Sequence, residues 1–484
     1  MSRQAAKPKA LQDSALYFGA QLAARLINFV YFLILTRKLP IDEFGVLNYV
    51  LSIIVLLDIM VDLGLSRHAM REVSRNNGLS GEFLRRILPY KFAASTLVFV
   101  GFTILVLNSG QPTNYQLISI FAALGLFFTS PAMVLENILQ AHHRFRMISC
   151  AHLALSVLQF LVGGAILVVG GSTIAISFTF ALTYFLYAGI VGWGVYLLAP
   201  SIPPRADYGA LARSIPAAFP YLVSAIVIMF AIRAEYVVLG YFGSKADLAV
   251  FGMASKIIEA SLLVPMAFST VMSPRFSKAH AMTVDTMARV YHSGLEIILL
   301  VSIPVCLIAI ALVPVAQYVL GTDGYDAIDD VLFVTFLGFV PASVFLYNTA
   351  ALFGATNQKK PLVILSFLGA AQIAINIVLQ SQLGMAGAAI AFVVFMVFAA
   401  SGTTLAIHFL YARRPGILCA LTAPVLGGGA MAMAVLWVGI GPAAVAGALA
   451  LFALVVWLWR HLKPQWVTDL DLTPERDDAT PAVL

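Results

Sequence analysis

The sequence predicts an all-α polytopic membrane protein with about 14 transmembrane helices. The first observation is composition, because 61% of the residues are hydrophobic and 11% are charged, whereas soluble domains carry about 25% charged residues. The second is that the apolar residues form continuous runs of the length that crosses a hydrocarbon core as a helix, about 20 residues. A transmembrane β-barrel would show alternating segments of about ten residues instead. The third is an internal repeat, which predicts two homologous six-helix halves followed by two more helices.

The stretch from Arg25 to Arg75 predicts a helical hairpin across the membrane. Two apolar segments flank a short polar turn at residues 37–44, and a basic run begins at Arg67. Pro40 in the turn ends the first helix, because proline lacks a backbone N–H. The acidic pair that follows it suits the positive end of the next helix dipole.

A second copy of this pattern lies at residues 233–278. Four pairs of landmarks are separated by 208, 208, 207 and 210 residues. Repeats of this kind are typical of secondary transporters. The pairs are Arg25 and Arg233, Arg67 and Arg275, Gly45 and Gly252, and Pro131 and Pro341.

The hydrophobic runs predict fourteen spans and five parts of the chain. The parts are an N-terminal half at 1–198, a cytoplasmic linker at 199–214, a C-terminal half at 215–411, two extra spans within 412–464, and a disordered cytoplasmic tail at 465–484. The spans are expected at 15–37, 45–65, 88–108, 115–139, 150–170, 173–198, 215–241, 247–271, 293–314, 331–354, 362–382, 387–410, 417–438 and 443–461.

Lysine and arginine predict the orientation, because they are enriched in cytoplasmic links. One set of links, which includes the run from Arg67 to Lys91, holds 23 of the 29 basic residues. The opposite links hold three, Arg37, Lys38 and Lys245. Both termini are therefore expected in the cytoplasm. The N-terminus is polar and basic, and it has no pattern of a cleaved signal peptide.

The remaining three basic residues, Arg25, Arg233 and Lys256, fall inside spans. A charge at a helix centre costs about 2.5–3.5 kcal/mol, so it needs a partner or a water-filled cavity. One hypothesis is that structural carboxylates neutralise them, with Glu259 beside Lys256, Glu235 or Glu259 beside Arg233, and Asp58 beside Arg25. The matched placement of the two arginines in the repeats favours a cavity between the halves.

The deep carboxylates Asp58, Glu235 and Glu259 are candidates for binding a coupling cation, either H⁺ or Na⁺. Three other acidic residues, Asp62, Glu136 and Glu296, lie near cytoplasmic span ends, where they are expected to reach water.

The sequence carries no signature of an enzyme, and no cofactor is indicated. It has no Walker loop, no large soluble domain and no feature that points to nucleic acid. The three cysteines lie in separate apolar segments, so core positions are expected rather than a metal site or a disulfide. His142 and His143 lack acidic or cysteine partners and are interpreted as contacts to lipid headgroups.

Three motifs resemble a known family. LTRKLPIDEFGVLNYVLSI, DLGLSRHAMR and RAEYVVLGYFGSKADLAVFGMASKI are similar to the polysaccharide-transport branch of the MOP superfamily. Its members are flippases for lipid-linked oligosaccharides in O-antigen (lipopolysaccharide) and exopolysaccharide assembly. Glu235 occupies an acidic position that is often Asp in the family. Phe251 precedes Gly252 where the family usually has G-x-Y, so Met253 and Ala254 depart from the pattern.

The resemblance implies an alternating-access transporter in the bacterial cytoplasmic (inner) membrane. Its substrate would be an undecaprenyl-pyrophosphate-linked oligosaccharide, with the polyprenyl tail left in membrane lipid. Arg25, Arg233 and Lys256 would bind the pyrophosphate, since arginine contacts phosphate through two parallel hydrogen bonds. A polysaccharide polymerase and glycosyltransferases are the protein partners that the resemblance implies.

Three alternatives stay open. A lipid II flippase would share the fold and a cationic cavity. A multidrug or cation antiporter of the same superfamily would instead have an acidic, aromatic cavity. A membrane glycosyltransferase or polymerase would need large outward loops, whereas the longest outward link here, residues 316–330, is short.

Overall fold

The computed structural model describes residues 6–198, 222, 226, 233–320, 324–354 and 359–411. Several expectations therefore lie outside the described residues. These are the linker at 199–214, nearly all of residues 215–232 in the seventh span, the two extra spans within 412–464, and the tail at 465–484.

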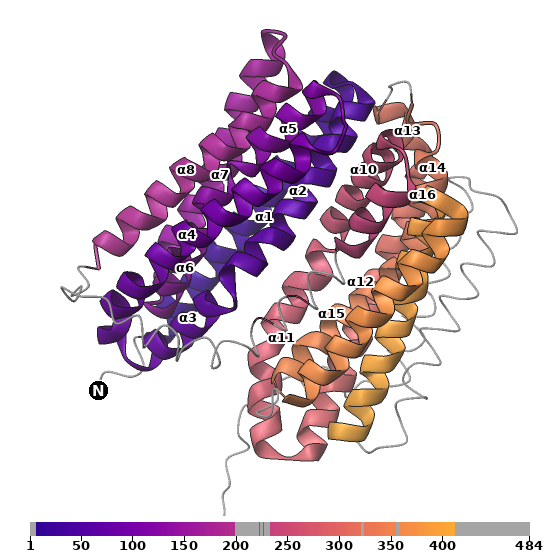
Figure 1. The fold of residues 1–484 in the computed structure, drawn as a ribbon. Helices are drawn as coiled ribbons and strands as arrows, with labels where there is room; N and C mark the ends of the chain where they lie inside the picture. The colour runs from indigo at the N-terminus through magenta and orange to yellow at the C-terminus, as the bar shows by residue number, and fades with distance from the viewer. Residues whose placement is uncertain are drawn as a thin grey trace, which may run out of the picture. The chain divides into compact units, whose positions relative to one another are not determined.

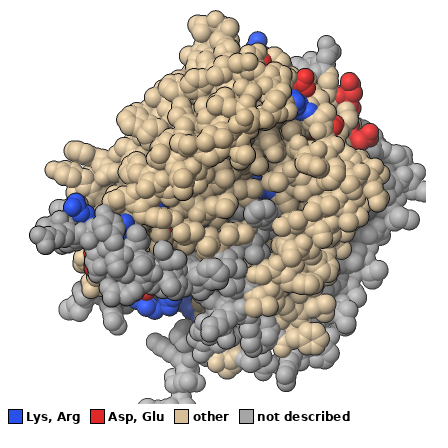
Figure 2. Space-filling view, in the orientation of Figure 1, with Lys and Arg blue, Asp and Glu red and all other residues tan. Residues whose placement is uncertain are grey.

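The described chain is helical throughout (Figure 1), and it contains no strand in these ranges. Figure 2 shows that most of the described surface on one face is uncharged, as expected where helices meet lipid. Helical residues 233–242 precede α10. The elements are α1 (Ala6–Lys38), α2 (Ile41–Asp62), α3 (Leu65–Arg75), the 3₁₀ turn η1 (Asn77–Leu79), α4 (Ser80–Leu107), α5 (Thr113–Ala123), α6 (Leu126–Ala141), α7 (Phe145–Val168), α8 (Thr173–Tyr196), α10 (Lys245–Ser261), α11 (Leu263–Met282), α12 (Val284–Ala311), α13 (Val313–Leu320), α14 (Ile328–Leu337), α15 (Phe339–Gly354) and α16 (Lys359–Tyr411).

Among the described residues, 8 helices are long and apolar enough to cross a membrane, or up to 10 if each of two bent pairs is one span. The longest apolar segment, Val363–Phe409, has 47 residues. At 1.5 Å per residue it would be about 70 Å long, twice what one crossing needs. Its helix is interrupted at Gly384, where φ is 55° and ψ is −129°. This segment therefore corresponds to the two expected spans at 362–382 and 387–410. The described residues do not establish the expected count of fourteen.

The first hairpin forms as its sequence predicts. Helix α1 ends at Lys38, and α2 begins at Ile41 after Pro40, whose φ of −55° and ψ of 136° are not helical. Asp42 and Glu43 occupy the first turn of α2, where the helix dipole favours negative charge.

The end of α2 corrects two expectations. Leu63 and Gly64 are left-handed, with φ of 47° and 74°, so the chain breaks before α3. Asp62 accepts hydrogen bonds from the Ser66 amide in the first turn of α3, at 3.3 Å, and from the Ser66 hydroxyl. Asp62 also pairs with Lys91 of α4 at 2.5 Å. Both side chains are buried, so Asp62 does not reach water and Lys91 is not part of an exposed basic surface. The cause is their mutual pairing, which allows both charges inside the helix bundle.

Tertiary contacts divide the chain into two compact units that differ from the halves expected from the repeat. The first unit comprises residues 1–263, 315–335 and 362–395. Within it, α2 packs against α10, the equivalent helix of the second repeat. A Cβ on Gly45 would collide with the backbone of Lys245, and one on Gly252 would press on Asn48 at 3.2 Å. The repeat-matched glycines thus permit close approach of the two helices.

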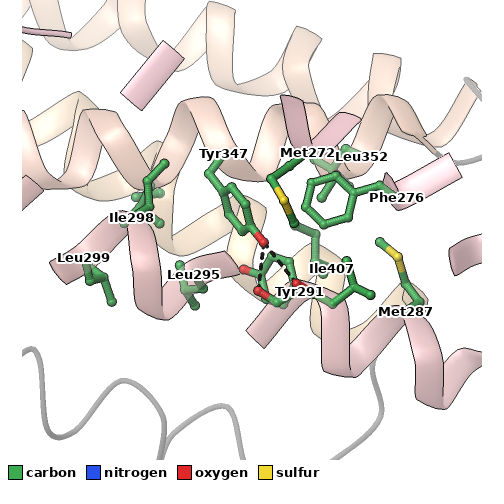
Figure 3. Close-up of a cluster of buried hydrophobic side chains, with 14 of the residues drawn as sticks. Met272, Phe276, Met287, Tyr291, Leu295, Ile298, Leu299, Tyr347, Leu352 and Ile407 are labelled. Atoms are coloured by element: carbon green, nitrogen blue, oxygen red, sulfur yellow. Dashed lines mark hydrogen bonds between the residues drawn. The ribbon is translucent and has the colours of Figure 1, made fainter. Parts of the chain in front are cut away.

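The second unit comprises residues 264–314, 336–361 and 396–484. Its described core contains stacked tyrosine rings, with the centroids of Tyr291 and Tyr347 5.6 Å apart (Figure 3). The Tyr291 hydroxyl donates to Asn348 at 2.8 Å, and the Tyr347 hydroxyl donates to the Tyr291 carbonyl at 2.9 Å. Both buried hydroxyls are therefore satisfied, as burial of tyrosine requires.

Candidate functional site

The first unit encloses a cavity of about 490 Å³ among α1, α2, α5 to α8, residues 233–242 and α10. Its wall carries aromatic rings, amides, hydroxyls and several charges. The charged and imidazole side chains on the wall are Asp58, Glu136, His152, Arg233 and Lys256.

Two of the cavity-lining cations, Arg233 and Lys256, belong to a cluster around a single carboxylate. Lys256 Nζ lies 3.1 Å from Glu259 Oε2, and Arg233 Nη1 lies 3.4 Å from Glu259 Oε1. The spacing of Lys256 and Glu259 on α10, three residues, places both on one face of the helix. The ammonium of Lys256 also lies over the Phe32 ring at 5.3 Å, and the guanidinium of Arg233 lies over Tyr236 at 5.6 Å. These ring contacts hold the cations at the cavity wall.

The structure brings the three predicted substrate-binding residues to this cluster with unequal roles. Arg233 and Lys256 contact Glu259 directly and line the cavity. Arg25 is exposed on α1 and is close enough for its charge to act on Glu259. Two cations therefore contact one carboxylate and the charge of a third acts on it, while the charge of Glu235 also acts on Arg233, which leaves three cations against two carboxylates. The pairs of Glu259 with Lys256 and Arg233 agree with the structural-carboxylate hypothesis, although one carboxylate cannot neutralise all three.

The other two coupling candidates lie in different environments. Asp58 lines the cavity, but its charged neighbours are Lys91 and Asp62, so the expected pairing with Arg25 is wrong. Glu235 is buried against α16, where Gln372 Nε2 donates to its carboxylate at 2.5 Å. The amide of Gln380 donates to the Glu235 carbonyl at 3.3 Å. Glu235 is therefore held by amides, and it makes no described ion pair with Arg233.

A second polar cluster on the cavity wall was not expected from the sequence. Glu136 of α6 accepts from Tyr187 of α8 at 2.6 Å, and it lies 3.3 Å from His152 of α7. Gln140 donates to the same carboxylate at 3.0 Å. Glu136 thus belongs to a network, whereas the sequence suggested a water-exposed span end. A histidine two residues inside the expected span 150–170 was the available signal.

A third group of polar residues also lines the cavity. Gln159 donates to Thr179 at 2.9 Å, and its amide oxygen accepts from Thr183 at 2.5 Å. The same amide nitrogen lies 3.4 Å from the Tyr31 hydroxyl, which links α7 to α1. Polar contacts inside the first unit therefore join α1, α7 and α8.

The histidines and cysteines give no metal site in the described part of the chain, where no group of three or more potential ligands gathers. Cys306 is buried as expected, but Cys150 is exposed, and Cys419 lies outside the described residues. His142 contacts the Ser80 hydroxyl at 2.8 Å. Its pKa is lowered by burial, and further by the charges of Arg144 and His143.

The sequence matches the polysaccharide biosynthesis protein family over residues 10–280, more than half of the chain. The chain belongs to this family. Comparison with curated proteins gave no match.

Solved structures show the same fold at low sequence identity. Lipid II flippase MurJ in an inward closed conformation aligns with a TM-score of 0.76 and 11% identity, over 92% of this chain and 99% of that one. An inward-facing multidrug resistance MATE transporter of the MOP superfamily aligns with a TM-score of 0.62 and 16% identity, over 80% of this chain and 94% of that one. A MOP superfamily transporter from Pyrococcus furiosus aligns with a TM-score of 0.61 and 15% identity, over 83% of this chain and 94% of that one. That transporter is described as having a binding pocket of reverse polarity. This member of the polysaccharide biosynthesis family is therefore a multi-pass membrane protein with the MOP superfamily fold.

Proposed function

We propose that this protein moves an undecaprenyl-pyrophosphate-linked oligosaccharide across the bacterial cytoplasmic membrane by alternating access. The observation that carries the proposal is the excess positive charge around Glu259, formed by Arg25, Arg233 and Lys256 within predicted spans. Membership of the polysaccharide biosynthesis family supports the substrate class.

The cluster is suited to binding a diphosphate within the predicted spans. Cations inside a membrane are costly unless an anion neutralises them. Glu259 supplies one negative charge at 3.1 Å from Lys256 and 3.4 Å from Arg233. A diphosphate brings two negative charges, and its oxygens accept parallel hydrogen bonds from two N–H groups of a guanidinium. The diphosphate would therefore displace Glu259 from the cations, or share them with it, while the polyprenyl tail stays in membrane lipid.

The arrangement in the membrane belongs to the same proposal. The chain would have fourteen spans, as two six-helix halves at 1–198 and 215–411 joined by the linker 199–214. Two further spans would lie within 412–464, and both termini and the tail 465–484 would be cytoplasmic. A polysaccharide polymerase and glycosyltransferases would be its partners, because they consume and supply such a glycan.

Coupling to an ion gradient would use H⁺ or Na⁺. Asp58, Glu235 and Glu259 are the candidate carboxylates. Asp58 faces the cavity, Glu235 is held by amides, and Glu259 contacts the cations that would hold the substrate.

Two alternatives share the fold. A lipid II flippase would use the same cationic cluster for a diphosphate. A multidrug or cation antiporter is favoured by a different observation, the carboxylates of Asp58 and Glu136 on the cavity wall. A membrane glycosyltransferase or polymerase has no supporting arrangement among the described residues.

The test replaces Arg25 and Arg233 separately by Ala in cells that lack any other copy of the protein. We expect loss of surface polysaccharide, accumulation of the lipid-linked glycan inside, and near-normal protein abundance. Lysine at either position should restore export in part, since it keeps the charge and loses the two-pronged contact. The matched control is Arg75→Ala, an exposed arginine on α3. Normal export by both alanine variants would exclude these arginines from substrate binding. Export of an organic cation in place of the glycan would support the antiporter.

A further inference from the structure

We propose that His152 binds a proton on the wall of the cavity, with Glu136 as its fixed counter-ion, and that this proton strengthens anion binding at Arg233 and Lys256. The effect on anion binding rests on the proposed function, whereas the proton site does not. The inference adds a titratable site that is separate from the three candidate coupling carboxylates.

The hydrogen bonds fix the charge of Glu136. Its Oε2 accepts from the Tyr187 hydroxyl at 2.6 Å, and its Oε1 accepts from Gln140 at 3.0 Å and faces His152 Nε2 at 3.3 Å. An ionised carboxylate is an acceptor only, whereas a protonated one must also donate. Tyr187 and Gln140 donate to these oxygens, and His152 Nε2 donates in the tautomer that carries its proton on that nitrogen. Glu136 is therefore a carboxylate here, and His152 is the partner that can gain a proton.

Few other charged groups face the pair of Glu136 and His152. On α6 and α8 the groups that face Glu136 are Gln140 and Tyr187, and on α7 the group is His152. The Tyr187 hydroxyl also lies 3.3 Å from His152 Nε2. On α2, Asp58 lines the same cavity.

The helices α1, α3 and α4, which also pack against α6 or α7, add few facing charges. On α1 the cavity wall carries the neutral groups Asn28 and Tyr31. On α4, Lys91 is already paired with Asp62. The arginines of α3 at positions 67, 71 and 75 are exposed on its outer face. The described charges that share the cavity wall with the pair are thus Asp58, Arg233 and Lys256.

Histidine is the side chain whose unperturbed protonation changes between pH 5 and 8. With neutral His152 the pair carries one negative charge, and with a proton on the free ring nitrogen the pair carries none. The proton comes from water in the cavity, and no bond other than N–H forms. Protonation therefore makes the cavity one unit more positive.

This change should affect the binding of an anion at Arg233 and Lys256. Arg233, Lys256 and His152 line one cavity, and charges in a low-dielectric site interact more strongly than in bulk water. A proton on His152 would raise affinity for the anion, and the bound anion would raise affinity for the proton by the same factor. Proton and anionic substrate would thus bind together rather than in exchange.

Proton binding can be tested without substrate. Protein with ¹⁵N-labelled histidine would be placed in lipid nanodiscs, and the His152 ring signal identified by its loss in His152→Asn. We expect the chemical shift of this signal to change as the pH is lowered from about 8 to about 5, the range in which histidine side chains in general gain a proton. In Glu136→Gln the protonated fraction at about pH 6 should fall, because the counter-ion is gone. A His152 signal that stays unchanged over this range would overturn the proposal, and so would a Glu136→Gln variant that titrates as the natural protein does.

Coupling to the anion is tested with P¹,P²-dimethyl diphosphate, a diester whose charge is constant over the same range. Calorimetry should show binding about fivefold or more tighter at about pH 5.5 than at about pH 8. His152→Asn should bind with little pH dependence, and His142→Asn, whose histidine lies outside the cavity, should behave as the natural protein does. Persistent pH dependence in His152→Asn would refute the coupling. If the probe binds at neither pH, the diphosphate function fails, while the histidine titration still decides the proton site. Should His152→Asn not fold, the ring signal whose titration changes in Glu136→Gln identifies His152, and the pH dependence of binding by Glu136→Gln tests the coupling.

Discussion

The buried pair of Lys91 and Asp62 gives the sharpest stability prediction. Lys91 Nζ lies 2.5 Å from Asp62 Oδ1, and Lys91 is fully buried. In Lys91→Met the ammonium is lost while most of the apolar stem is kept. Among the described residues, Asp62 then keeps only the Ser66 amide and hydroxyl as partners. Removing one member of a buried pair costs about 3–5 kcal/mol, because the abandoned charge stays in a low-dielectric site. The folded-to-unfolded ratio should fall about a hundredfold or more.

The assay is thermal unfolding of the purified protein in detergent, together with its abundance in membranes. The double variant Asp62→Asn with Lys91→Met should recover much of the loss, since neither residue is then charged, and the double-mutant cycle isolates the pair. The matched control is Arg75→Met. Arg75 pairs with Glu72 at 3.4 Å on the surface, with 62% of its side chain exposed, and such pairs contribute below about 1 kcal/mol. If Lys91→Met unfolds like Arg75→Met, or the double variant is no better than the single one, the ion pair does not hold α2 and α4 together.

Three further predictions follow from the topology, the helix contact and the coupling candidates. In a protein without its three cysteines, Asp326→Cys should react with an impermeant thiol reagent from the outside and Asn77→Cys only from the cytoplasm; labelling of Asp326→Cys only from the cytoplasm would reverse the topology. Gly45→Ala should lower stability by about 1–3 kcal/mol, because the new methyl group meets backbone of α10. Gly164→Ala, with nothing within 4 Å of the added atom, should be neutral in the same unfolding assay, and equal losses would argue against the close contact. The amide variant of the true coupling carboxylate should bind substrate but lose dependence on ΔpH or Na⁺ in vesicles; dependence retained by all three amide variants would place coupling elsewhere.

Several features could be predicted from sequence because their causes are local. Composition and run length specify membrane-spanning helices. Pro40 and the acidic residues after it specify the first hairpin turn. The contact between Lys256 and Glu259 follows from helical spacing alone, since residues three apart share a face. The matched glycines at 45 and 252 marked equivalent helices, although the sequence did not show that these two helices touch each other.

The tertiary structure alone decided which polar residues meet across helices. Three contacts join residues from different helices, separated by between 16 and 137 positions in the chain: Asp62 with Lys91, Glu136 with His152 and Tyr187, and Glu235 with Gln372. Their contacts depend on the order in which the helices pack and on the rotation of each helix about its axis. Hydrophobicity specifies that a helix enters the membrane. Its nearly uniform apolar surface, however, sets neither the packing order of the helices nor the rotation of each one. Packing of side chains and the requirement that buried polar groups find partners set both, and these are properties of the assembled fold.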